Sequence, residues 1–177
     1  MDPRQFWQLI ERSKAQSEGD CDRQVDALTA LLLELPATDI MAFDRLFEQY
    51  VDQAYRNDLW AAAYIIQGGC SDDGFEYFRR WLIGQGEAVY TAALRDPESL
   101  LSVVTSHNQG NPFLRFEDAP FLRLECEPLG YVADQAYEQK TGSVMPRSPH
   151  PLPELIGEDW DDEDLPAMCP KLWAAFE

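Results

Sequence analysis

The chain has 177 residues, a length typical of one domain that buries its own core without a metal or a disulfide. Its 32 acidic residues outnumber its 14 basic residues, which gives a formal net charge of −18. Such a surface repels nucleic-acid phosphates and anionic membranes, so we expect neither as a partner. It attracts basic proteins, although a high net charge also serves solubility alone. The 45% of hydrophobic residues indicates a globular protein.

The first residues, MDPRQFW, contain neither a basic nor an apolar leader segment, and no apolar run is long enough to cross a bilayer. We therefore expect a cytoplasmic protein. The cysteines are far apart in the sequence and form no CxxC pair, so we expect all of them to be reduced thiols. They are Cys21, Cys70, Cys126 and Cys169.

Apolar residues recur at helical spacing through the first half of the chain. Asp2 is the predicted N-cap of a first helix that ends at Gly19. A second helix is predicted over residues 22–35, closed by Pro36, and a third begins with Thr38 as its N-cap. The short connection between the second and third helices favours antiparallel packing.

Two glycines join the next pair of helices. Residues 59–66 are nearly all apolar, which predicts a buried helix, and Gly68 provides its left-handed C-cap. Ser71 caps the following helix, and Asp72 and Asp73 lie in its first turn, where carboxylates favour the helix dipole. The segment is therefore a helix–tight turn–helix.

The helical pattern weakens further along the chain. Two short helices are expected between residues 88 and 103, residues 105–128 are expected to be a loop with room for one short strand, and residues 131–139 form another helix. The chain is therefore predicted to be a single, mostly α domain: a bundle of about seven or eight helices with less than about 10% strand. A helical core over residues 1–104 precedes a loop-rich half, residues 105–177, with one or two helices and an acidic tail.

Residues 141–153 are rich in proline, serine and glycine, so we expect them to form an irregular segment, called the strap below. Residues 154–164 follow it and are called the acidic segment. This acidic segment holds seven acidic residues and no basic one. Beyond it, apolar residues are expected to dock the C-terminal end on the core: Leu172, Trp173 and Phe176.

The acidic segment is similar to the start of an EF-hand loop, because acidic residues occupy every second position at Asp159, Asp161 and Glu163. However, Asp164 stands where the loop needs glycine, and Pro170 stands where it needs glutamate. We therefore predict no EF-hand and no dedicated metal site.

The candidate functional site is the helix–turn–helix between residues 60 and 86. One interpretation is a well-capped core hairpin in which Arg79 is buried and paired with a carboxylate or with backbone carbonyls, while Arg80 faces water. The other is a ligand or partner pocket at the turn. Its candidate residues are Trp60, Tyr64, Gly69, Ser71, Asp72, Asp73 and Arg79.

This segment, WAAAYIIQGGCSDDGFEYFRRWLIGQG, resembles the motif of the uncharacterised DUF4240 family. The matching positions include Leu59, Trp60, the GGxSDDxF stretch that begins at Gly68, and the FRxWLI stretch that begins at Phe78. FWQLIE near the N-terminus and PKLWAAF near the C-terminus are also similar. The resemblance spans most of the chain and is specific, but it implies no activity, substrate or cofactor.

No nucleotide-binding, zinc-protease or serine-hydrolase motif occurs in the sequence. Cys70 precedes a helix, but no spacing supports a Cys–His dyad with His107 or His150, and both histidines lie in loop-like sequence. We identify no catalytic residue and expect no cofactor. The favoured hypothesis is a non-catalytic binding protein, such as an inhibitor, immunity or regulatory partner of a basic protein. The alternative is an enzyme or small-molecule binder whose site lies at residues 68–75.

Overall fold

The computed structural model describes residues 1–107, 124–147 and 151–176. Within these ranges the chain folds into ten α-helices and two short 3-10 helices, and it forms no strand. In chain order the helices are α1 (Pro3–Ser17), α2 (Cys21–Leu33), α3 (Ala37–Gln53), α4 (Asn57–Gln67), α5 (Asp72–Gly84), α6 (Glu87–Arg95), η1 (Pro97–Ser99), α7 (Leu100–His107), η2 (Glu127–Tyr131), α8 (Val132–Thr141), α9 (Leu165–Met168) and α10 (Pro170–Phe176).

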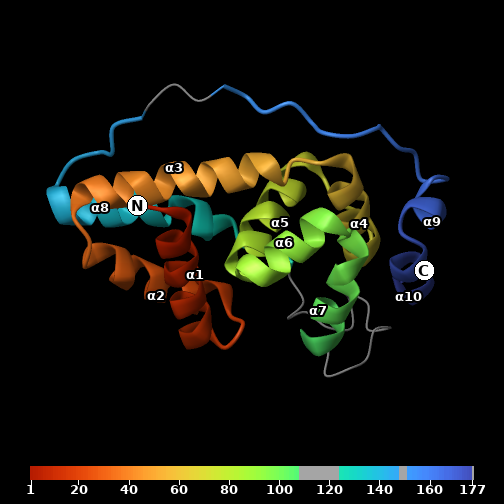
Figure 1. Ribbon diagram of the computed structural model, residues 1–177, viewed down its shortest axis with the longest axis horizontal. Helices are drawn as coiled ribbons and strands as arrows, with labels where there is room; N and C mark the ends of the chain where they lie inside the picture. The colour runs from red at the N-terminus through yellow and green to blue at the C-terminus, as the bar shows by residue number, and fades with distance from the viewer. Residues whose placement is uncertain (108–123, 148–150, 177) are drawn as a thin grey trace.

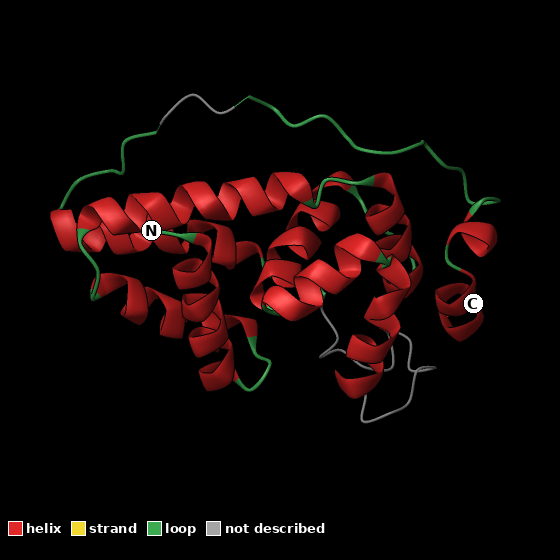
Figure 2. Ribbon diagram, viewed as in Figure 1, coloured by secondary structure: helices red, strands yellow, loops and turns green. Residues whose placement is uncertain are grey.

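The predicted mostly helical fold is confirmed (Figure 2). The helices outnumber the seven or eight expected because the C-terminal docking segment forms two of its own, α9 and α10, each with a proline at its start. The described part of the second half therefore holds three α-helices, where one or two were expected. The strand considered within residues 105–128 falls mostly on residues 108–123, which lie outside the described ranges.

Most predicted helix ends agree with the structure. Asp2 caps α1 through a capping box, in which its carboxylate accepts a hydrogen bond from the Gln5 backbone N–H at 2.8 Å. The prediction for α3 is wrong, because the helix begins at Ala37 after Pro36 and no side chain caps it. The backbone at Pro36, with φ fixed near −59°, leads the chain into the helix one residue before Thr38.

The helices form two groups that share one core (Figure 1). In the first group α1 packs on α2, and α8 packs on both α2 and α3. In the second, α6 packs on α5, α7 packs on α6 and η1, and α9 and α10 pack against α4. Aromatic rings fill the centre: Phe6 stacks on Phe43 at 4.8 Å, and Phe75 stacks on Phe78 at 6.1 Å between ring centroids. Both pairs are fully buried.

The described residues of the strap lie outside the helical body on the side of α3, and the acidic segment continues past the end of α3 to α9 (Figure 1). Two backbone hydrogen bonds fix the acidic segment at the junction of α3 and α4: Ile156 N–H donates to the Tyr55 carbonyl at 3.0 Å, and Asn57 N–H donates to the Ile156 carbonyl at 2.8 Å. The C-terminal end docks as predicted. Leu172 is fully buried, and Trp173 and Phe176 are partly buried against the core.

The expectation of four reduced cysteines is wrong. Cys21 and Cys126 form a disulfide, with their Cα atoms 5.8 Å apart, although 105 positions separate them in the sequence. Packing of η2 against the start of α2 brings them together. Cys70 and Cys169 are free thiols. No helix in the described ranges is long and apolar enough to cross a membrane.

Candidate functional site

The α4–α5 hairpin turns at two glycines whose backbone conformations require glycine. Gly68 has φ of 66° and is the left-handed C-cap of α4, as predicted, while Gly69 has φ of 126°. The Gly69 N–H donates to the Tyr64 carbonyl at 2.8 Å. Gly69 is therefore explained by the turn itself, since no side chain lies within 4 Å of the Cβ that another residue would carry.

Ser71 begins α5 as its N-cap, as predicted. Its hydroxyl oxygen accepts a hydrogen bond from the Gly74 N–H at 3.2 Å. Asp72 and Asp73 follow in the first turn, and both are exposed. The serine therefore has a structural role, while the two aspartates remain available to a ligand or partner.

Trp60 holds the two helices of the hairpin together. Its indole N–H donates to the Cys70 carbonyl at 3.0 Å, and its ring lies nearly parallel to Phe75, at 4.8 Å and 8°. Tyr64 instead faces the C-terminal half: its ring meets Trp160 edge-on at 5.4 Å. Both candidates are thus committed to contacts within the protein.

Arg79 is buried and paired, as predicted, with only 7% of its surface exposed. Its Nη1 donates to the Val51 carbonyl at 2.9 Å, and its guanidinium lies over the rings of Tyr55 and Phe75, at 4.6 and 5.2 Å from their centroids. The Nε atom has no hydrogen-bond partner. Burial lowers the pKa of Arg79 from its ordinary value.

The prediction that Arg80 faces water is wrong, because only 8% of its surface is exposed. Its guanidinium pairs with Glu76, one turn earlier, and donates to the Glu127 carbonyl at 2.9 Å. The absence of a side chain at Gly130 leaves room for this guanidinium, because a Cβ at that position would lie 2.5 Å from the Arg80 Cζ. The ring of Tyr131 covers the same guanidinium at 4.9 Å.

A cavity of about 420 Å³ lies beside the first turns of α5. It brings together three of the seven candidate residues, Asp72, Asp73 and Arg79, and leaves Trp60, Tyr64, Gly69 and Ser71 outside its lining. The other described lining residues come from α3, the α3–α4 connection, α5 and the strap: Glu48, Val51, Asp52, Tyr55, Glu76, Leu152 and Pro153.

The sequence interpretation missed three carboxylates of this cavity, Glu48, Asp52 and Glu76. A signal was present, because Glu48 and Asp52 lie four residues apart on α3, and Asp72 and Glu76 lie four residues apart on α5. That spacing places each pair on one helix face. Which faces meet depends on how α3 packs on α5, and no local pattern gives this.

Among the described residues the cavity has five carboxylates against the Arg79 guanidinium, and this charge suits a cationic group. The carboxylates do not form a metal centre: no cluster of three or more His, Cys, Asp or Glu side chains in the described part of the chain has the arrangement of an ion site.

Neither free cysteine is an activated nucleophile. Burial and the nearby Glu125 raise the pKa of the Cys70 thiol to about 12, and burial raises that of Cys169 to about 11. The thiolate is therefore a very minor species at neutral pH. The side chain of His107 and all of His150 lie outside the described residues, so the geometry of a Cys–His dyad is not described.

Residues 1–139 match the model of a family described as "Protein of unknown function (DUF4240)". The match covers more than half of the chain, so the chain belongs to this family, as its hairpin sequence suggested. No curated protein and no solved structure matches it.

Proposed function

We propose that this DUF4240 protein acts by binding a basic protein through its acidic segment, residues 154–164, as a non-catalytic regulatory, inhibitor or immunity-type partner. The observation that carries the proposal is that the segment is both acidic and held in place. All seven of its carboxylate side chains are exposed, and none forms an ion pair with another described residue.

The way in which the segment is held supports a binding role. Its backbone is paired with the α3–α4 junction through Ile156, and the Trp160 indole donates to the Asn57 carbonyl at 3.0 Å. A charged surface that is already ordered loses less conformational entropy on binding than a disordered tail. It also accelerates encounter with a basic partner by long-range attraction.

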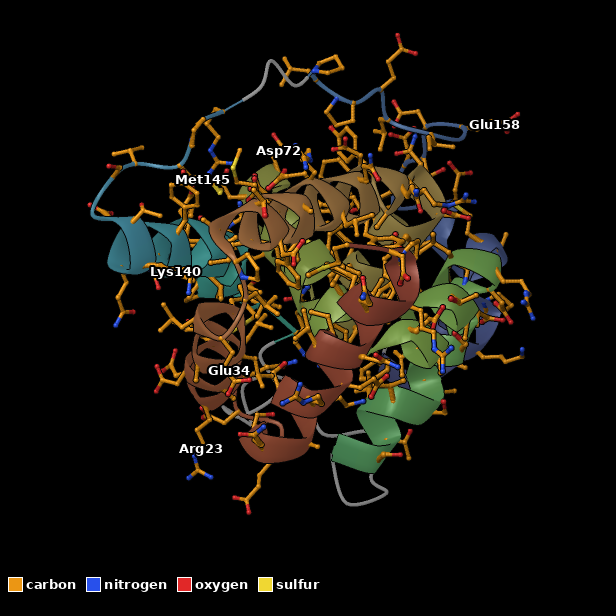
Figure 3. All side chains as sticks on the ribbon, turned by 60° about the vertical axis from the view of Figure 1, so that its left-hand side comes forward. Arg23, Glu34, Asp72, Lys140, Met145 and Glu158 are labelled. Carbon is orange, nitrogen blue, oxygen red and sulfur yellow. A yellow bond between two sulfur atoms is a disulfide. The ribbon has the colours of Figure 1, made fainter. Side chains whose placement is uncertain are left out.

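The acidic surface continues beyond the segment. The cavity beside α5 includes Leu152 and Pro153, directly before the segment, together with the exposed Asp72 and Asp73. In Figure 3, Asp72 and Glu158 both lie on the side of the helical body along which the strap runs. One basic partner of ordinary interface size is therefore able to contact both.

The experiment is capture from the source organism's lysate on the tagged protein, at low and at moderate salt, with quantitative mass spectrometry. The test variant neutralises Glu158, Asp161, Asp162 and Glu163, whose side chains make no hydrogen bond to another described residue; Asp159 and Asp164 are kept because each accepts one from a backbone N–H. We expect one or a few basic proteins that are lost as salt rises and lost with the test variant.

The control variant changes the net charge by the same amount on a distant surface. It neutralises four exposed acidic residues of α2, its C-cap and α8, of which Glu34 is labelled far from Glu158 in Figure 3: Asp22, Asp26, Glu34 and Glu138. The control is expected to retain the partner. Equal loss from both variants, or capture that does not depend on salt, contradicts a specific role for the segment.

A second candidate function is supported by the 420 Å³ cavity, whose size and five carboxylates suit a small cationic molecule as ligand or substrate. Thermal-shift measurements with a panel of diamines and guanidinium compounds test it. Stabilisation by one of them that Asp73→Asn removes, with the fold intact, favours this candidate. If such a compound is also turned over, the protein is an enzyme.

The proposal places the protein in the cytoplasm. Disulfides usually persist in oxidising compartments, so a cytoplasmic Cys21–Cys126 bond has to resist the thiols present there. Thiol alkylation of intact cells, followed by peptide mass spectrometry, tests the location and the bond together. Recovery of the protein in the periplasmic or secreted fraction contradicts a cytoplasmic location.

A further inference from the structure

The Cys21–Cys126 disulfide forms part of the wall of a second cavity, of about 450 Å³, between the start of α2, α5 and the segment before η2. A cavity of this size admits a small thiol. Its wall also contains Tyr77 and Trp81 of α5, so the disulfide faces a defined space and not a flat surface.

Among the residues that the structure describes, the charged lining of this cavity is of one sign. Four acidic residues line it, Asp20, Asp22, Glu125 and Glu127, and no described basic residue does. Lys14 and Arg80 donate hydrogen bonds to the backbone carbonyls of two lining residues, but neither side chain is part of the lining. An anion that enters therefore meets an unfavourable potential, which salt weakens.

The two sulfur atoms differ in access. Cys126 is 4% exposed, and its backbone N–H donates to the Tyr77 carbonyl at 3.1 Å, whereas Cys21 is half-buried. An external thiolate therefore reaches the Cys21 Sγ first. Because thiol–disulfide exchange is an in-line attack by a thiolate, Cys126 is then the leaving group.

We propose that the Cys21–Cys126 bond is a thiol-exchange site that selects its reductant by charge, accepting zwitterionic or cationic small thiols and rejecting anionic ones. A thiolate attacks the Cys21 Sγ, the Sγ–Sγ bond breaks, and Cys126 leaves as a thiolate that takes a proton from solvent. A second thiolate attacks the outer sulfur of the mixed disulfide. The products are one external disulfide and two protein thiols, so two thiols supply the two electrons.

Reduction rates with three thiols test the proposal. The thiolates of cysteamine, 2-mercaptoethanol and 3-mercaptopropionate carry no net charge, one negative charge and two negative charges. Each rate is divided by the thiolate concentration and by the rate of the same thiol on hydroxyethyl disulfide. The freed Cys21 and Cys126 are trapped with iodoacetamide and counted by peptide mass spectrometry.

We expect cysteamine to be favoured over 3-mercaptopropionate by at least about ten-fold at roughly 10 mM salt, and by less than about three-fold at roughly 1 M salt, where screening is nearly complete. Such a preference, independent of any partner of the acidic segment, supports the site. Equal normalised rates for all three thiols at low salt overturn it.

A matched pair of variants separates the cavity from the net charge of the whole protein. Asp22→Asn with Glu125→Gln and Glu127→Gln neutralises the cavity, and Asp20 is kept because its side chain caps α2. The control, Glu34→Gln with Asp161→Asn and Asp162→Asn, changes the net charge equally elsewhere. We expect the cavity variant to lower the low-salt preference for cysteamine over 3-mercaptopropionate at least about three-fold. The control variant is expected to lower the same preference less than half as much. An equal fall in both overturns the proposal.

Discussion

The α4–α5 hairpin and the acidic segment hold their charges in opposite ways. In the hairpin, the guanidinium groups of Arg79 and Arg80 are removed from water and covered by aromatic rings. In the acidic segment, every carboxylate is exposed and only the backbone, Trp160 and a few apolar side chains attach it to the helices. We therefore expect substitutions in the hairpin to change the free energy of unfolding, and substitutions of the segment's carboxylates to leave it nearly unchanged.

One tryptophan in each region makes the same hydrogen bond, a donation at 3.0 Å from its indole to a backbone carbonyl. Trp60 is partly buried and also stacks on the buried Phe75, so we expect Trp60→Ala to lower the free energy of unfolding by about 3 kcal/mol. Urea denaturation measures the loss. A loss below about 1 kcal/mol would show that the stacking adds little.

Arg79→Met is expected to lower the free energy of unfolding by about 2 kcal/mol. Methionine fills a similar volume but leaves the Val51 carbonyl without its donor and removes the contact with Tyr55. Arg147→Met, in the strap, is the comparison: that side chain is 55% exposed, and its ion pairs with Asp44 and Asp134 each contribute less than about 1 kcal/mol. Equal losses in the two variants would contradict the difference between the regions.

Trp160→Ala is expected to cost only about 1 kcal/mol, because its ring has an edge-on contact with Tyr64 and is partly exposed. Its main effect is local. Hydrogen exchange at the Ile156 and Asn57 amides should accelerate, while exchange in α5 stays unchanged. Acceleration throughout α4 and α5 would mean that the segment supports the hairpin.

The pH dependence of Asp44 follows from its position where the strap crosses α3. Burial raises the pKa of Asp44 to about 6, although the Arg147 guanidinium lies 3.2 Å away. The folded state therefore binds a proton more tightly than the unfolded state, so the contribution of Asp44 to stability falls as pH rises from about 4 to about 6. Carbon-13 NMR titration of the carboxyl measures the midpoint. Asp44→Asn should flatten this part of the stability profile, and a midpoint near 4 would contradict the burial.

The smallest expected effect on stability is that of neutralising Glu158, Asp161, Asp162 and Glu163. Exposed side chains without partners in the described structure change the free energy of unfolding by about 0.5 kcal/mol or less. Thermal unfolding measures this. A larger change in either direction would mean that these carboxylates contribute to the stability of the fold. Loss of the partner in the capture experiment could then result from a change in stability and not from a lost contact.

Local patterns predicted the helices, the hairpin turn and the burial of Arg79, because periodicity, glycines and caps act over a few residues. Arg80 was misplaced because its partners on η2 and the space at Gly130 come from a distant part of the chain. The disulfide was missed for the same reason, since Cys21 and Cys126 are joined only by tertiary packing. The carboxylates of the cavity were found only where they neighbour the turn, at Asp72 and Asp73.

The most direct test of the proposed function is the affinity of the captured basic partner, measured by isothermal titration calorimetry over a series of salt concentrations. We predict that the dissociation constant rises steeply with salt for the natural protein and for the control variant on α2, its C-cap and α8. For the variant of Glu158, Asp161, Asp162 and Glu163, we predict weaker binding and a shallower dependence on salt. The same affinity and the same salt dependence in all three proteins would contradict binding through the acidic segment.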